Sequence, residues 1–363
     1  MNGRSKDIVL LLGAGASAEA GIPTSDQMIR KIEEFLVGDK EWRVFADLYN
    51  HVKSAIYYSA GLHGRFNDKV NYNIETLVNT LYELEKYEEH PLYPFIAAWN
   101  SRFEGLAKRG FSQVRKFRGQ ILKALKKWMC PENTSSGDYY RGLATLQREL
   151  NFPLPIFSLN YDLCVERLKD REFRVEAGFA GFGNEHVWDW ERFEDMSANP
   201  PPQIVLYKLH GSVNWKRNDE TKQLFSVEQV ESVDAGRMEV IFGRDFKLEA
   251  ADPYLFYAYE FRRYTLAAKL IVTVGYGFGD AHINKMLAQG LADDPHRQLL
   301  VVCNCGDGKK DKWTQLVRDQ LEINEPAARQ VTVYQGTAQQ FMETPDLAKI
   351  LLEKIPKDPD VPF

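Results

Sequence analysis

Three polar side chains that could cleave a bond follow two short apolar segments in the middle of the chain. Asn160 and Asp162 come at the end of 154–159, and His210 follows 204–209. A carboxamide can hold a water molecule or a hydroxyl group without a full charge, and an imidazole that titrates near neutrality can accept a proton. Asp162 can orient the site or cap a following helix. Such groups suit proton transfer to or from a hydroxyl or a water molecule.

Each of these residues also has a purely structural interpretation. An Asn at the end of a strand usually bonds its own backbone in a turn, and a His before a Gly is more often packed or exposed than a base. We favour a catalytic role because Asn160, Asp162 and His210 all follow the carboxyl ends of expected strands. Ligands of open α/β sheets bind in the crevice at that edge.

An anion site is indicated near the N-terminus, where the apolar run 8–12 leads into a glycine-rich turn and an expected helix. Gly13 and Gly15 allow close approaches that a Cβ would block, and the first N–H groups of a helix can bind a pyrophosphate. Together with Ala18 they meet only the relaxed dinucleotide-binding pattern, which a tight turn without a ligand also meets. On this interpretation Ser17 and the glycine-turn backbone hold the phosphates.

Four segments in order resemble motifs of the sirtuin family. Residues 13–23 resemble its first motif, Gly-Ala-Gly-x-Ser-x-x-x-Gly-Ile-Pro, residues 157–162 its Asn-x-Asp motif, and residues 207–212 its His-Gly motif. Residues 270–284 resemble the glycine turn of bacterial sirtuin-like proteins rather than the Gly-Thr-Ser turn of protein deacylases. Between the first two motifs, little matches beyond the tripeptide 73–75, Asn-Ile-Glu.

The resemblance implies that NAD is the ligand and substrate, with Asn160 and His210 as the catalytic pair and Asp162 beside them. The NAD contacts that it implies are Gly13, Ala14, Gly15, Ser17, Gly21, Ile22, Pro23, Thr24, Gly275, Tyr276, Gly277, Asp280, Asn284, Asn304 and Thr337. Asp280 with Asn284 at helical spacing is also typical of an N-cap and first helical turn, and both interpretations are kept.

The adenosine side of the expected site lies near the C-terminus. Asn304 follows an apolar run much as a ribose-contacting Asn follows a strand in sirtuins, and residues 336–338 resemble the final turn of that family, near the base. Both matches are short. They place Asn304 and Thr337 among the expected NAD contacts.

The chain departs from deacylating sirtuins where those enzymes carry a zinc module with paired cysteines. Residues 211–269 contain no cysteine, so no zinc ribbon can form there and the acyl-peptide groove is put in doubt. The usual Asp-Phe-Arg after the first motif is replaced by Thr-Ser-Asp at 24–26. Cys303 and Cys305 are two apart on a probable strand, which favours packing over chelation. We expect no metal site.

Water is then the expected acceptor, and hydrolysis of NAD to nicotinamide and ADP-ribose is the leading hypothesis. The variant glycine turn and the missing zinc module are similar to sirtuin-like effectors of bacterial antiphage defence, several of which work with partners such as HerA-type ATPases. We therefore expect a latent or partner-gated enzyme and a homo-oligomer. The alternatives are an NAD-dependent protein deacylase or ADP-ribosyltransferase, and a non-catalytic sensor of NAD or ADP-ribose. Retention of both Asn160 and His210 disfavours the sensor.

Composition agrees with a soluble cytoplasmic enzyme. The 363 residues are 44% hydrophobic, enough for one large α/β domain and a smaller one. We recognise neither a leader peptide nor an apolar run of membrane-spanning length. Four cysteines without a pairing pattern suit a reducing compartment, and the net charge of -5 argues weakly against direct nucleic-acid binding.

Periodicity predicts an α/β fold, with a Rossmann-like, doubly wound, mainly parallel sheet and a helical insertion domain. The expected strands are 8–12, 154–159, 204–209, 270–274, 299–303 and 331–334. We expect residues 1–26 and 151–363 to form the NAD-binding catalytic domain. Residues 27–150 form the insertion, in which Ile74, Leu77, Val78, Leu81 and Leu84 have helical spacing.

Two further stretches receive structural interpretations. Residues 108–127 carry eight Lys or Arg and no acidic residue, typical of a solvated helix face, with a phosphate-binding or partner-binding surface as the alternative. Trp188, Trp190 and Phe193 could line a pocket mouth or an oligomer interface, and core packing is favoured for them.

Overall fold

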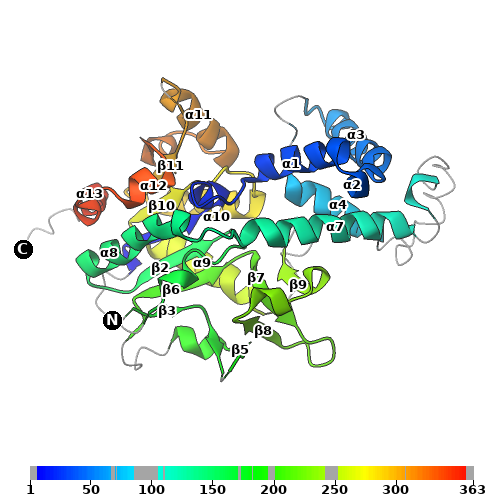
Figure 1. Cartoon of the computed structure of the whole chain (residues 1–363). Helices are drawn as coiled ribbons and strands as arrows, with labels where there is room; N and C mark the ends of the chain where they lie inside the picture. Colours follow the sequence, from blue (N-terminus) through cyan, green and yellow to red (C-terminus); the bar gives the residue numbers. More distant parts are fainter. Residues whose placement is uncertain are drawn as a thin grey trace, which may run out of the picture.

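A parallel sheet of seven strands forms the centre of the protein (Figure 1). The computed structural model describes residues 6–66, 70, 72–85, 105–108, 111–170, 173–181, 183–194, 201–241, 252–306 and 308–356. The strands, in spatial order, are β12 (Val331–Gln335), β11 (Gln298–Cys303), β10 (Leu270–Val274), β1 (Ile8–Leu12), β2 (Leu154–Ser158), β6 (Ile204–Lys208) and β3 (Val175–Glu176). Every neighbouring pair is parallel.

Both faces of this sheet are covered, which explains why its strands are apolar throughout. In β1, Ile8, Leu10 and Leu12 belong to the hydrophobic core on one face, and Val9 and Leu11 belong to the core on the other. The mainly parallel α/β sheet expected from the sequence is confirmed. All six expected strands are present, with ends within one residue of the prediction.

Helices complete the two outer layers. The core that contains Ile8 includes residues of α8 (Arg141–Leu150), α12 (Ala338–Met342) and α13 (Leu347–Lys354). The opposite core includes residues of α9 (Tyr254–Ala267), α10 (Ala281–Asp293) and α11 (Lys310–Leu321). None of the helices in the described part of the chain is long and apolar enough to cross a membrane.

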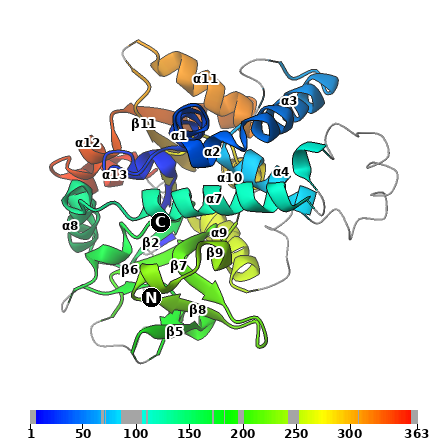
Figure 2. The same cartoon turned by 45° about the vertical axis from the view of Figure 1, so that its right-hand side comes forward.

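The described part of the long stretch between β1 and β2 is mainly helical, as expected. It includes α8 and also α1 (Ser25–Gly38), α2 (Lys40–Arg43), α3 (Ala46–Leu62), α4 (Ile74–Glu85) and α7 (Ser112–Met129). The last five gather beside the sheet in Figures 1 and 2. Helix α4 buries Ile74, Leu77, Val78 and Leu81, whereas Leu84 is only partly buried. These side chains join the same core as Ile8. The division into two domains stays a prediction.

A second sheet was not predicted. It is antiparallel, with the strand order β4 (Phe179–Ala180), β5 (Glu185–Trp188), β8 (Leu224–Val227), β7 (Gly211–Arg217) and β9 (Met238–Val240). Gly211 has a φ of +81° and turns the chain from β6 directly into β7. Its absent Cβ also matters, because such an atom would lie 2.1 Å from the backbone oxygen of Glu239. Three strands of this sheet, β7, β8 and β9, therefore lie in the cysteine-free interval 211–269.

The aromatic residues near β5 pack mostly into the core, as favoured. The indole Nε1 of Trp188 donates to the hydroxyl of Tyr257 at 3.1 Å, and the ring of Phe193 stacks on Tyr207 with centroids 4.7 Å apart. Trp190 is the exception, with 43% of its surface exposed.

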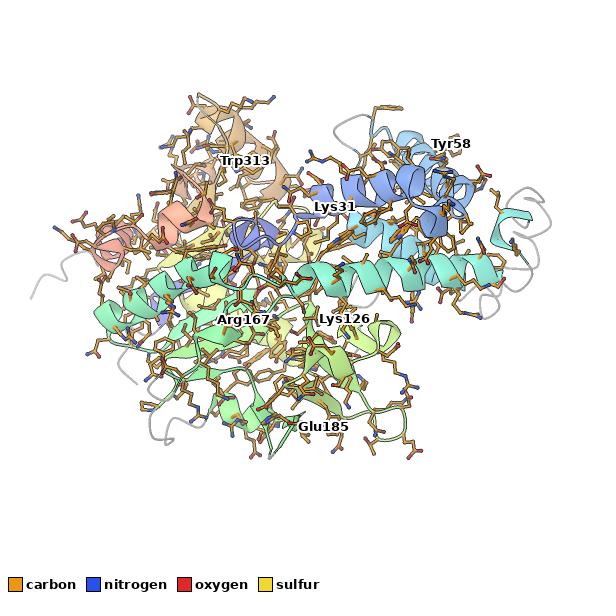
Figure 3. All side chains as sticks on the ribbon, in the orientation of Figure 1. Lys31, Tyr58, Lys126, Arg167, Glu185 and Trp313 are labelled. Carbon is orange, nitrogen blue, oxygen red and sulfur yellow. The ribbon has the colours of Figure 1, made fainter. Side chains whose placement is uncertain are left out.

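Part of the basic stretch is used within the chain. Arg118 forms an ion pair with Glu85 at 2.7 Å, and the amine of Lys126, labelled in Figure 3, donates to the backbone oxygen of Glu231 at 3.2 Å. The exposed members in the described part of α7 are Arg115, Lys116, Lys123 and Lys127. Arg109 lies outside the described residues. Lys108, before this helix, is also exposed. Exposure fits a solvated face and a phosphate-binding or partner-binding surface equally, so both interpretations stay predictions.

Candidate functional site

One long cavity runs along the carboxyl edge of the parallel sheet. Its volume is about 650 Å³, within the ~300–1,000 Å³ that is usual for cofactor sites. Residues after six strands line it, in the spatial order Thr337, Asn304, Gly275, Gly13, Asn160 and His210. Because neighbouring strands lie about 4.8 Å apart, five spacings make the floor roughly 24 Å long. Such a cavity suits an elongated ligand.

Most of the expected site residues line this cavity. They are Gly13, Ala14, Gly15, Ile22, Pro23, Thr24, Asn160, Asp162, His210, Gly275, Tyr276, Gly277, Asp280, Asn304 and Thr337. Ser17, Gly21 and Asn284 are not among the lining residues. Gly21 lines a shallower hollow next to the cavity, and the other two lie behind its wall.

The glycines of the two turns pack against each other. A Cβ on Gly13 would lie 2.6 Å from Cα of Tyr276, and one on Gly275, whose φ is +62°, would lie 2.1 Å from N of Ala16. The N–H of Gly15 donates to the oxygen of Gly275 at 2.9 Å. Packing between the turns therefore accounts for these glycines, and the N–H of Gly15 is used within the chain.

The helix after the first glycine turn is shorter than expected. It is a single 3₁₀ turn, η2 (Ala14–Ser17), because the chain bends again before α1 begins at Ser25. Thr24 and Asp26, at the start of α1, also line the cavity. The long helix that opens toward the cavity is thus α1, about ten residues later than the sequence pattern indicated.

Gly277 differs from Gly275 in the second turn. It lines the cavity, and a Cβ built on it would meet no atom within 4 Å. Contacts within the chain therefore do not account for a glycine here. Open space beside the backbone is what a closely approaching ligand needs.

The carboxamide of Asn160 has a fixed orientation. Its Nδ2 donates to the backbone oxygen of Gly13 at 2.9 Å and to Oγ of Ser17 at 3.1 Å. Ser17 donates its one hydroxyl proton to Oδ2 of Asp162 at 2.7 Å, so it accepts from Asn160. Because both amide hydrogens point into the floor, Oδ1 is the end left for a ligand. Asp162 therefore acts on Asn160 through Ser17.

Ser17 lies beneath the cavity rather than on its wall. It is fully buried, and its Oγ is also 2.8 Å from the hydroxyl of Tyr140. Burial, with the charge of Asp162 nearby, raises the pKa of Tyr140 well above its usual range, so the phenol stays protonated and donates. With these partners Ser17 supports Asn160, and its expected contact with the phosphates stays a prediction.

His210 lies between two carboxylates. Its Nε2 is 3.1 Å from Oδ2 of Asp280, and its Nδ1 is 3.6 Å from Oε1 of Glu75. Nδ1 is buried and has no hydrogen-bond partner among the described residues. A neutral imidazole that donates from Nε2 to Asp280 carries its lone pair on Nδ1. Nδ1 is therefore the nitrogen that can accept a proton.

Asp280 and Asn284 hold the second glycine turn in place. Oδ1 of Asp280 accepts from the N–H of His282 at 2.9 Å, which confirms the expected N-cap of α10. Nδ2 of Asn284 donates to the oxygen of Phe278 at 2.8 Å, and its Oδ1 accepts from the hydroxyl of Tyr276 at 2.8 Å. Asn284 is thus a support of the turn from behind the wall.

Glu75 is a site residue that the sequence analysis did not assign. It is the second residue of α4, whose first turn is capped by Oδ1 of Asn73, which accepts from the N–H of Thr76 at 2.9 Å. The charge of Glu75 also contributes, after burial, to raising the pKa of Tyr161 well above its usual range. The only sign of Glu75 in the sequence analysis was the resemblance of the tripeptide 73–75 to sirtuins, which assigned no role to this residue.

The wall of the cavity is acidic. Its charged residues are Glu19, Asp26, Glu75, Asp162 and Asp280, and the lining residues that the structure describes include no Lys or Arg. The cavity therefore favours positive charge in a ligand.

The described residues contain no group of three or more His, Cys, Asp or Glu that could hold a metal ion. Cys303 lines the cavity as a free thiol, and burial raises its pKa to about 12. It is therefore a protonated, unreactive side chain at neutral pH.

Comparison with protein families agrees with the sirtuin resemblance over part of the chain. Residues 155–323 match the family described as the SIR2-like domain. This segment is sirtuin-like. It contains Asn160, Asp162, His210 and the second glycine turn, and it excludes the first glycine turn. No curated protein matches the chain.

Solved structures of Sir2 proteins resemble the chain at low identity. A Sir2 homolog in complex with NAD is 14% identical, with 98% of this chain and 92% of that chain covered and a TM-score of 0.44. A mutant Sir2 homologue with 2'-O-acetyl ADP ribose is 14% identical, with coverage of 97% and 94% and a TM-score of 0.44. Sir2Tm bound to a propionylated peptide is 13% identical, with coverage of 93% and 91% and a TM-score of 0.40.

Gly275 and Gly277 of the second turn should respond differently to substitution. We expect Gly275→Ala to lower stability by at least ~1–2 kcal/mol, because its left-handed backbone disfavours a Cβ and the turns are forced apart. We expect Gly277→Ala to leave the Tm unchanged, because its Cβ enters open space. Thermal unfolding of both variants measures this, and an equal loss at both positions would contradict the packing account.

Proposed function

We propose that the chain is an NAD glycohydrolase, which cleaves the bond between the nicotinamide nitrogen and ribose C1′ to give nicotinamide and ADP-ribose. The observation that carries the proposal is that Asn160 and His210 line one cavity, each oriented by a partner behind it, Ser17 and Asp280 respectively. A module that only binds a nucleotide does not need an oriented amide beside an imidazole with a free lone pair.

The cavity suits NAD in shape and in charge. Its length accommodates an extended dinucleotide, and Gly277 leaves room beside the backbone. Glu75 and Asp280 flank His210, while Asp162 supports Asn160. These carboxylates surround the end where the positive nicotinamide ring would lie, and they would favour the positive ribose that forms as it leaves.

Asn160, His210 and Asp280 have different roles in the proposed reaction. The C1′–N bond breaks and its electron pair stays on the nicotinamide nitrogen, whose positive charge is thereby neutralised, so no acid is needed. Oδ1 of Asn160 accepts a hydrogen bond from a ribose hydroxyl or from the attacking water. The water oxygen bonds to C1′ and Nδ1 of His210 takes its proton, while Asp280 stabilises the imidazolium.

Water as the acceptor is supported by the sequence after His210. Residues 211–269 contain no cysteine for a zinc module, and three strands of the antiparallel sheet lie in this interval. A protein deacylase or an ADP-ribosyltransferase would use the same catalytic pair, so an added acceptor distinguishes them. If NAD is consumed only in the presence of an acylated peptide or an acceptor protein, the chain is a deacylase or an ADP-ribosyltransferase and the glycohydrolase proposal is wrong.

Asn160→Ala and His210→Ala should abolish the release of nicotinamide. We expect a loss of at least ~10²-fold, because each variant removes a group that touches the reacting atoms. Chromatography of protein incubated with NAD measures both products. The exposed His296→Ala is a matched control and should retain full activity. Activity that survives in either cavity variant, with an unchanged Tm, would sink the assigned roles.

Ser17→Ala separates two roles for that residue. If Ser17 fixes Asn160, as its bonds indicate, kcat should fall while KM for NAD changes little. If Ser17 instead held phosphates, KM would rise with kcat preserved. Steady-state kinetics over a range of NAD concentrations decides between them, with a matching Tm as the check on folding.

We further propose that the activity is latent and is released in antiphage defence by a partner such as a HerA-type ATPase, in a cytoplasmic homo-oligomer. The support is the resemblance of the second glycine turn and the missing zinc module, and an unrestrained NAD hydrolase would harm its host. The purified chain alone should therefore turn over NAD much more slowly than the chain mixed with products of neighbouring genes. Full activity of the partner-free chain would overturn the gating.

A further inference from the structure

Glu19 lies at the opposite end of the cavity from His210. Its Oε2 accepts from the N–H of Gln339 at 2.8 Å, in the first turn of α12, directly after β12. In the sheet, β12 and β6 are separated by four strands, and His210 follows β6. Glu19 itself is exposed and lines the cavity. Its carboxylate therefore faces whatever part of a ligand lies farthest from the catalytic pair.

The proposed reaction fixes what that part is. With the nicotinamide end at Asn160 and His210, the pyrophosphate lies near the central glycine turns and the adenosine reaches the loops after β11 and β12. Asn304 and Thr337 line the cavity there together with Glu19. NAD and NADP differ only at the 2′ position of the adenosine ribose.

A carboxylate at this position discriminates between the two dinucleotides. It accepts a hydrogen bond from a free 2′-hydroxyl, and it repels a 2′-phosphate, which sites for NADP usually neutralise with an Arg. No Lys or Arg is found among the described residues that line the cavity. A 2′-phosphate would thus add charge of about −2 to a wall that is already acidic.

We propose that Glu19 selects NAD over NADP by contact with the adenosine ribose. The inference rests on the proposed function, because that function sets the direction of the ligand in the cavity. It assigns a specificity-determining role to a residue whose structural contact, to the N–H of Gln339, would be equally well made by a glutamine.

Stopped-flow tryptophan fluorescence tests the proposal on the full chain, because Trp313, labelled in Figure 3, lines the cavity and binding can be observed before turnover. We expect wild type to bind NAD at least ~10-fold more tightly than NADP, since like charges brought together are costly. Glu19→Gln should keep the Tm and the affinity for NAD, and should reduce the ratio of the affinities for NAD and NADP by about tenfold. Glu19→Lys should reduce this ratio further or reverse the preference.

Asp26→Asn is the matched control, because it removes the charge of another carboxylate on the same wall. If contact with Glu19, rather than the total charge of the wall, selects NAD, the ratio of the two affinities stays unchanged in Asp26→Asn. Equal binding of NAD and NADP by wild type, or the same shift in Asp26→Asn as in Glu19→Gln, would overturn the role of Glu19 while the proposed function stands. Failure of both dinucleotides to bind wild type would instead remove the proposed function, and the role of Glu19 with it.

Discussion

Close contact between the two glycine turns is the constraint on which the site depends. β1 and β10 are neighbours at the centre of the sheet, and the turns that follow them touch where the N–H of Gly15 meets the oxygen of Gly275. A side chain on Gly13 or Gly275 would push the turns apart. The two turns form the middle of the cavity floor. On one side of them lie the residues that follow β2 and β6, and on the other side lie those that follow β11 and β12. The packed turns thus join both sides into one long cavity.

Polar groups beneath the floor supply the second constraint. Lys208 is buried, and its amine contacts Oε1 of Glu166 at 3.0 Å and also the backbone oxygen of Asp162. Burial raises the pKa of Glu166, and the nearby Lys208 opposes that shift. Removing such groups from water costs free energy unless each is paired. The pairing ties the loop that carries Asp162 to β6, and the orientation of Asn160 follows through Ser17.

Local pattern predicted six of the seven strands of the central sheet, because each of these six is a largely apolar run followed within two residues by Gly, Asn or His. It missed β3, which has only two residues. It failed for the antiparallel sheet, where β5 pairs with β8 although the two strands lie far apart in sequence and neither is buried throughout. The same limit explains Glu75 and Ser17. The contact of Glu75 with His210 depends on how α4 packs, and the role of Ser17 depends on partners more than 120 residues away. Neither contact can be inferred from the residues next to Glu75 or Ser17 in the sequence.

The charge of the cavity links its wall to turnover in the proposed reaction. Its carboxylates, with no described Lys or Arg beside them, oppose a pyrophosphate unless the ligand brings positive charge of its own. NAD does so at the nicotinamide ring. Once the C1′–N bond has broken and the neutral nicotinamide has left, ADP-ribose retains its phosphates but has lost that positive charge. The carboxylates that favour the positive ribose in the transition state therefore also favour departure of the product, so catalysis and product release depend on the same groups.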